Sequence, residues 1–226
     1  MSDLSDPSDL SDHLLTMAEV FLENKGGYRH LRAYKVTESI YDITWEFVQR
    51  YLSKGDRTTD QMIQAARSGK QNIAEGSAAS TTSKETEIKL TNVAKASLEE
   101  LLLDYEDYLR AHRLEQWRKG HKRYERMRLY TQTPNFAADL RDRMPQFNDE
   151  ELANLAITLI NQATYLLRRL LEAQQKQFVT EGGIREQMTR ARLNYRTQQI
   201  EDKPAGSTSP TRPIDHTSPT GSVPSK

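Results

Sequence analysis

Two stripes of side chains run along the segment Gln61–Gly76, and they constrain the fold more than any other feature of the chain. The first stripe is apolar or small and recurs at spacings of three and four residues: Met62, Ala65, Ala66, Gly69, Ile73 and Gly76. The second stripe is polar and lies on an adjacent face of the same helix: Gln61, Ser68, Asn72 and Glu75. Small residues let a neighbouring helix approach closely, and buried polar groups then need partners. The sequence therefore predicts that this helix is the packing centre of a helical bundle.

Similar periodicity predicts three more long helices and no strand. They are expected at 28–52, at 82–112 with a capping box from Thr82 to Glu85, and from Asp149 to 176. Along 28–52 the expected inward positions are Leu31, Tyr34, Tyr41, Trp45 or Thr44, Val48, and Tyr51 or Leu52. Together with 56–79 these segments predict an all-α protein, an up-down-up-down four-helix bundle over residues 13–176.

The remaining segments are expected to be accessory. Residues 113–148 form an insertion between the third and fourth helices, with helices predicted at Trp117–Tyr130 and Asn135–Met144. A Gly182-Gly183 break leads into a suffix helix, Ile184–Gln199, in the region 177–203. The composition of 1–12 and 204–226 predicts disorder, and His13–Asn24 is predicted to be a short amphipathic helix.

Composition narrows the class of protein. The 226-residue chain has a formal net charge of zero and a mean hydropathy of −0.80, so nucleic-acid binding through overall charge is not supported. There is no cysteine, no signal-peptide pattern, and no apolar run near the ~20 residues of a membrane span. A cytoplasmic protein without a membrane segment is expected.

The sequence offers no pattern for catalysis. A di-iron bundle needs Glu-x-x-His on two helices, and no glutamate here has a histidine three residues later. No phosphate-binding loop, dinucleotide fingerprint or nucleophile–base pairing is present. The carboxylates between Glu99 and Asp107 are those of a solvated helix face. We therefore expect no enzyme activity, no metal and no cofactor.

A basic run in the insertion is the strongest candidate for a binding site. On a helix, Trp117, His121, Tyr124 and Arg128 would share one face, flanked by Arg118, Lys119, Lys122, Arg123 and Arg126. Aromatic rings that stack on bases, beside cations that pair with phosphates, are what single-stranded nucleic-acid binding requires. The alternative is that the insertion docks on the acidic end of the preceding helix, at 104–115.

Two segments of the sequence resemble a known family. DRTTDQMIQAARSGKQNIAEGSA and TSKETEIKLTNVAKASLEELLLDYEDYLR are similar to the bacterial four-helix-bundle proteins found as reading frames in intervening sequences of large-subunit ribosomal RNA genes. The accessory variability protein of diversity-generating retroelements belongs to the same group. The family pattern falls on Gln61, Arg67, Ser68, Gly69 and Asn72–Gly76, and GGIREQMTRAR resembles the subgroup with a four-helix-bundle suffix. The resemblance covers about residues 28–112 and 149–196.

The resemblance implies a homo-oligomer, specifically a pentameric barrel, that acts as an accessory to nucleic-acid chemistry. The partners implied are RNA, single-stranded nucleic acid or a reverse transcriptase. The alternative is a scaffold that binds only protein, which the neutral charge and acidic N-terminus favour. Asn72 and Glu75 have two interpretations, cross-bonding to neighbouring helices or lining the lumen of a barrel.

Overall fold

The computed structural model describes residues 27–201, and every regular element in that range is a helix, which confirms the all-α prediction. The expectations for 1–12, His13–Asn24 and 204–226 lie outside the described residues. The chain divides into two units, residues 1–187 and 188–226, and each is described by itself. Within the described range no helix combines the length and hydrophobicity needed to cross a membrane.

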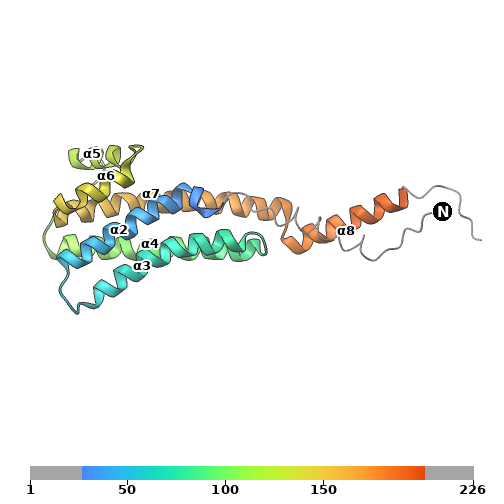
Figure 1. Ribbon diagram of the computed structural model, residues 1–226, viewed down its shortest axis with the longest axis horizontal. Coiled ribbons are helices and arrows are strands. Elements are labelled where there is room, and N and C mark those ends of the chain that lie inside the picture. The colour runs from blue at the N-terminus through green and yellow to red at the C-terminus, as the bar shows by residue number, and fades with distance from the viewer. Residues whose placement is uncertain (1–26, 202–226) are drawn as a thin grey trace, which may run out of the picture. The chain divides into compact units, whose positions relative to one another are not determined.

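Four long helices form the bundle (Figure 1). They are α2 (Arg32–Tyr51), α3 (Arg57–Ala79), α4 (Lys84–Ala111) and α7 (Asp149–Glu181). A short 3₁₀ turn, η1 (Tyr28–His30), precedes α2, and α8 (Ile184–Glu201) follows α7. The insertion contributes α5 (Lys122–Tyr130), α6 (Phe136–Arg143) and a second 3₁₀ turn, η2 (Met144–Gln146).

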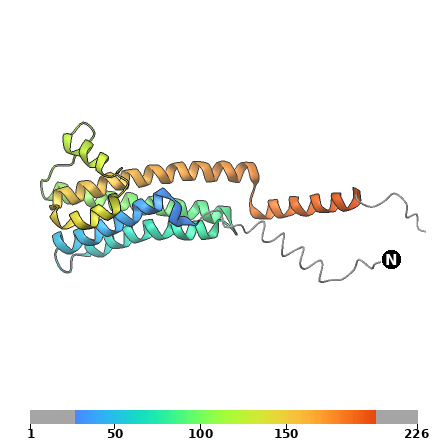
Figure 2. The same cartoon turned by 45° about the horizontal axis from the view of Figure 1, so that its top comes forward.

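The four long helices contact one another in a closed ring. α2 packs on α3 and α7, and α4 packs on the same two helices, as the two ribbon views agree (Figure 2). The short connections from α2 to α3 and from α3 to α4 favour antiparallel neighbours. One continuous cluster of buried apolar side chains fills the ring and extends into the insertion.

The stripe of small residues on α3 is buried as predicted, and α4 is the helix that approaches it. A Cβ atom added at Gly69 would lie 2.6 Å from Cδ2 of Leu98, and one added at Gly76 would lie 3.3 Å from Cβ of Leu90. Beside this contact, Oγ of Ser68 lies 2.8 Å from Oγ of Ser97. The two helices therefore pack closely because α3 carries no side chain at these two positions.

Replacement of Gly69 by leucine is expected to lower the free energy of unfolding by about 1–3 kcal/mol, because even its Cβ would lie 2.6 Å from the fully buried side chain of Leu98. Leucine is the better helix former by about 0.8 kcal/mol, so the measured loss understates the packing cost. Urea denaturation measures it, with Ala78→Leu on the exposed side of α3 as the control. Equal stability of Gly69→Leu and the wild type would contradict the close contact.

The buried face of α2 differs from the expected one. The residues that face the core are Ala33, Thr37, Ser39, Ile40, Ile43, Thr44, Phe47 and Val48. Of the expected set, Val48 and the alternative Thr44 are buried, Tyr34 and Tyr41 are only partly buried, and Trp45 is half exposed. Two threonines can face the core because their hydroxyls donate to carbonyls of the preceding turn, Thr37 to Tyr34 and Thr44 to Ile40, both at 2.7 Å.

Helix ends also differ in detail from the sequence prediction. α2 begins at Arg32 rather than Tyr28, because Leu31 is extended and separates it from η1. α4 is capped by Ser83, whose Oγ accepts from the backbone N–H of Thr86 at 3.1 Å, and not by Thr82. At the start of α7 a full capping box joins Asn148 and Glu151. α7 continues past 176 to Glu181, and Gly182, with φ of +76°, ends it.

The most enclosed part of the bundle is α7 and not α3, which corrects the expected packing centre. Every residue from Leu152 to Ile160 is buried. An ordinary surface helix buries one stripe, and a helix buried on all sides has partners all round it. α2 and α4 pack on α7 from the inner side of the ring, and α5 of the insertion packs on it as well.

Candidate nucleic-acid interface

The basic run is not one helix with an aromatic face, because α5 begins only at Lys122. Trp117 precedes it in an irregular segment and is 5% exposed, so its ring is not available to stack on a base. Gly120, with φ of +95°, interrupts the expected helix, and His121 restarts it as N-cap by accepting from the N–H of Arg123. The prediction that Trp117 presents a stacking surface is therefore wrong.

Trp117 instead forms hydrogen bonds that hold the insertion against α7. Its backbone N–H donates to Oδ1 of Asn154 at 2.7 Å, and its indole N–H donates to Oε1 of Glu150 at 2.9 Å. The amide of Asn154 donates in turn to the carbonyl of Glu115 at 2.9 Å. Arg123 lies over the indole ring and also pairs with Glu150 at 3.2 Å. Two residues of the predicted site, Trp117 and Arg123, are thus committed to holding the insertion in place.

The surface on which the insertion docks is α7, and this corrects the alternative that placed it on the acidic end of α4. α5 packs on α7, and Nε2 of Gln162 donates to Oγ1 of Thr131 at 2.6 Å. The acidic end is contacted by the segment before α5, where Gln116 donates to Glu106 at 2.8 Å and the imidazole of His121 lies 3.6 Å from the carboxylate of Glu115. The carboxylates of α4 do not neutralise the cations of α5.

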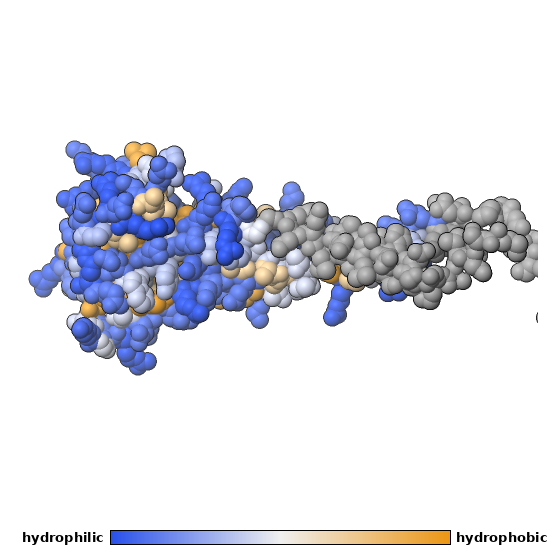
Figure 3. Space-filling view, in the orientation of Figure 1, coloured by the Kyte–Doolittle hydropathy of each residue, from blue (hydrophilic) through white to orange (hydrophobic). Residues whose placement is uncertain are grey.

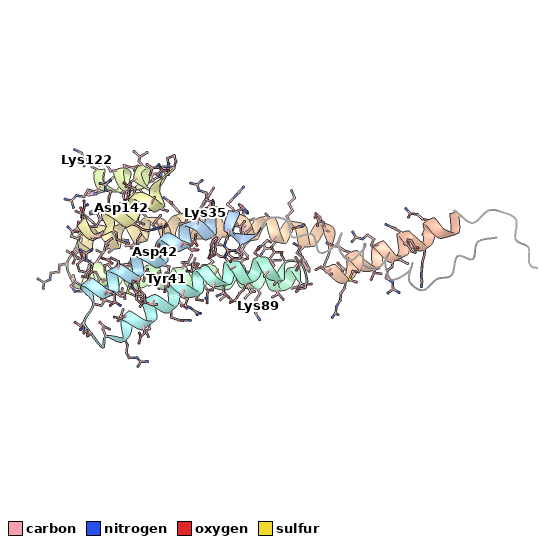
Figure 4. All side chains as sticks on the ribbon, viewed as in Figure 1. Lys35, Tyr41, Asp42, Lys89, Lys122 and Asp142 are labelled. Atoms are coloured by element: carbon pink, nitrogen blue, oxygen red, sulfur yellow. The ribbon has the colours of Figure 1, made fainter. Side chains whose placement is uncertain are left out.

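Four cations of the predicted site remain exposed to solvent, and none of them forms an ion pair with any described residue: Arg118, Lys119, Lys122 and Arg126. Lys122 stands at the outer edge of α5 (Figure 4). Arg128 pairs with Glu125 at 3.6 Å, and both side chains are about half exposed. Such a surface pair contributes little and exchanges readily for another anion.

A groove of about 330 Å³ opens between α5 and α7. Two residues of the predicted site line it, Tyr124 and Arg128. The other lining residues are Gln132, just after α5, and six residues from α2 and α7: Arg32, Thr158, Asn161, Gln162, Tyr165 and Leu166. The groove combines two arginines, two tyrosines and three side-chain amides, a set that suits a planar, phosphorylated ligand.

The start of α2 adds to the positive character of this groove. Arg32 is the first residue of α2, and Leu31 provides no side-chain cap. The first turn holds no acidic residue, so the partial positive charge of the helix end is not neutralised within it. Sequence reasoning missed Arg32 because nothing in the local pattern around it points to the insertion.

The family-pattern residues on α3 divide into buried and exposed groups. Gly69 and Gly76 are buried against α4, whereas Gln61, Arg67 and Glu75 are exposed. Asn72 donates to the carbonyl and hydroxyl oxygens of Ser68 in its own helix, at 2.9 and 3.0 Å, so it does not cross-bond to a neighbouring helix.

A second groove, of about 470 Å³, lies between α3 and α4 and is acidic. Asp60, Glu100 and Asp104 line it, with Gln61, Gln64, Ala65, Ser68 and Ser97. Burial raises the pKa of Asp104, and the nearby carboxylates of Asp107 and Glu100 raise it further.

Hydrophilic residues predominate on the face of the bundle seen in Figure 3, and apolar side chains form only small separate spots there.

The described residues contain no group of three His, Asp or Glu side chains placed to hold a metal ion. Comparison of the chain with protein-family models, with curated proteins and with solved structures finds no match.

Proposed function

We propose that this protein is a non-catalytic helical-bundle accessory that binds single-stranded nucleic acid, RNA in the first place, through the outer surface of α5 and the groove between α5 and α7. The observation that carries the proposal is the groove itself, because Tyr124 and Arg128 meet Arg32, Tyr165 and three amides there. Unpaired cations on the outer side of α5 would continue the contact to neighbouring phosphates.

The resemblance to the bacterial four-helix-bundle family agrees with this proposal. It also suggests a reverse transcriptase as partner and a homo-oligomer, a pentamer, as the assembled form. Light scattering on the full chain tests the assembly. The acidic groove between α3 and α4 favours a second candidate function, a scaffold that binds a basic protein segment and has no nucleic-acid role.

Binding of single-stranded RNA is expected to weaken as salt rises, with a log–log slope of roughly −0.7 for each phosphate contact. The double variant Lys122→Gln, Arg126→Gln should flatten this slope by about 1.4, because each residue is an exposed cation of the insertion. Filter binding at several salt concentrations measures it.

Lys54→Gln with Lys89→Gln is the matched control, since it removes equal charge from two exposed positions. Lys54 lies in the α2–α3 connection, and Lys89 lies on α4 (Figure 4). The control should leave the slope unchanged. Absence of detectable RNA binding at low salt would refute the proposal and leave the protein-binding scaffold. An equal change in both double variants would show that the contact is not localised on α5.

A further inference from the structure

We infer that the acidic segment at residues 1–12 binds the cationic surface of the insertion and competes there with nucleic acid. The cationic surface consists of four exposed residues: Arg118, Lys119, Lys122 and Arg126. The docking of the segment is independent of the proposed function, whereas its consequence, weaker binding of RNA, rests on that function. The segment would then act as a competitor of the ligand that is part of the same chain.

The side chains of residues 1–12 carry charge of one sign only. Four aspartates recur at every third position, and each of them follows a serine: Asp3, Asp6, Asp9 and Asp12. The segment contains no lysine, arginine or histidine. In an extended chain a repeat of three residues spaces the carboxylates about 9–10 Å apart. Negative charge repeated at even intervals is also what draws a nucleic-acid strand to a cationic protein surface.

The cationic surface lacks counter-charge from the part of the chain that the structure describes. None of its four residues forms an ion pair with a residue in the range 27–201. Glu125, the acidic residue of α5, pairs with Arg128 instead, at 3.6 Å. Because the whole chain has a formal net charge of zero, acidic residues elsewhere balance these cations, and residues 1–12 hold four of them.

The segment joins the described chain beside this surface. Gly27 is the first described residue, and Arg32, five positions later, lines the groove between α5 and α7 together with Tyr124 and Arg128 of α5. The start of α2 and α5 therefore border the same groove. The residues between Asp12 and Gly27 span up to about 50 Å when extended, whereas α5, with nine residues, is only about 14 Å long. The connection is long enough for the segment to lie along the whole of α5.

Apolar contacts would add to the pairing of charges. Leu4 and Leu10 stand between the aspartates of the segment. The surface that they would meet exposes Leu129 of α5, at 66%, and Tyr165 at the groove, at 54%. Ion pairs at an exposed surface each contribute little. A segment held by a few such pairs and two apolar contacts is bound weakly enough for an RNA strand with more charges to displace it.

The docking is tested on the full chain without RNA. The chain contains no cysteine, so Ser8→Cys provides a single site for a nitroxide spin label. The label is expected to broaden the amide NMR signals of α5 and to leave those of the acidic groove between α3 and α4 unchanged. The broadening should be lost at high salt and in the aspartate variant, which combines Asp3→Asn, Asp6→Asn, Asp9→Asn and Asp12→Asn. Broadening that is absent at low salt, or equal in the aspartate variant, would overturn the inference.

The competition is tested by filter binding of single-stranded RNA to the aspartate variant without the label. If the docked segment leaves about one molecule in ten open, the variant should bind RNA about tenfold tighter than the wild type at low salt. The difference should disappear at high salt, where the contacts of the segment and of RNA are both screened. The matched control keeps every charge of the segment and should bind as the wild type does: Ser2→Ala, Ser5→Ala, Ser8→Ala and Ser11→Ala.

A double-variant cycle distinguishes docking on α5 from simple repulsion between the segment and RNA. Adding Lys122→Gln and Arg126→Gln to the aspartate variant should reduce the tenfold effect, because the segment and RNA share these cations. Repulsion at a distance would leave the effect unchanged, which would overturn the inference.

The outcomes also separate the inference from the proposed function. Charge-dependent broadening of the α5 signals without binding of RNA would support the docking and overturn the function. Binding of RNA by a chain whose α5 signals show no charge-dependent broadening would overturn the inference and leave the function.

Discussion

Trp117→Ala is expected to lower the free energy of unfolding by about 3–5 kcal/mol, the range for truncating a large buried aromatic residue. The side chain is 5% exposed and belongs to the core cluster. Its removal also takes away the indole N–H that donates to Glu150 at 2.9 Å and the ring beneath Arg123. The insertion would then lose its main attachment to α7.

The same variant distinguishes the two interpretations of this tryptophan. A stacking residue on a nucleic-acid surface would reduce RNA affinity and leave stability intact. The buried position instead predicts a large loss of stability, measured by urea denaturation, with an unchanged salt slope of RNA binding at a temperature where the variant is folded. Trp117→Phe should cost less, since it keeps most of the ring, and Leu129→Ala, whose side chain is 66% exposed, should cost under about 0.5 kcal/mol. Wild-type stability of Trp117→Ala with reduced RNA affinity would restore the stacking interpretation.

Local patterns predicted the features of the fold that depend on one helix at a time. The small stripe of α3 could be found because spacings of three and four residues put Gly69 and Gly76 on one face, whatever packs against it. The beginnings of α3 and α7 could be found for the same reason, since Asp56 and Asn148 cap the helices that follow directly. These properties are encoded within a few residues of where they act.

The position of Trp117 could not be derived in this way. Periodicity alone put it on a helix with Tyr124, although Gly120 between them was the one residue that disagreed with a helix. The structure shows that Gly120 adopts φ of +95°, which ends any helical path at that point. What then draws Trp117 inward is Asn154 in α7, which lies 37 positions further along the chain. No local pattern contains that partner.

The groove between α5 and α7 could not be predicted from the sequence either, because its residues come from separate helices. Arg32 begins α2, Tyr124 lies on α5 and Tyr165 on α7, so the groove exists only once the insertion has docked. The sequence grouped the residues of the basic run as one candidate site, but their contacts depend on which side of the insertion they occupy. Arg123 pairs with Glu150 and holds the insertion, whereas Lys122, its neighbour, forms no ion pair with any described residue.

The error on α2 concerns which aromatic residue faces the core. The heptad-like spacing predicted either Trp45 or Thr44 on the inner face, yet Trp45 is 50% exposed, and Phe47, two positions later, is fully buried. Two positions on a helix differ by about 200°, so one of the pair must point outward when the other points inward. The hydroxyl of Tyr105 donates to Oγ1 of Thr44 at 3.0 Å, which places that threonine, and with it Phe47, on the inner face.

Phe47→Ala is therefore expected to destabilise the protein by about 3–5 kcal/mol, and Trp45→Ala by less than about 1 kcal/mol. Phe47 lies at the centre of an aromatic cluster, with ring centroids 5.0 Å from Tyr105, 4.7 Å from Tyr108 and 5.5 Å from Tyr51. Removing it leaves a cavity beside three rings and forfeits the edge-to-face contacts with Tyr105 and Tyr108. Urea denaturation of the two variants decides which face of α2 is buried. The reverse order of stability, with the tryptophan variant the weaker, would mean that α2 is rotated in solution relative to its orientation in the bundle.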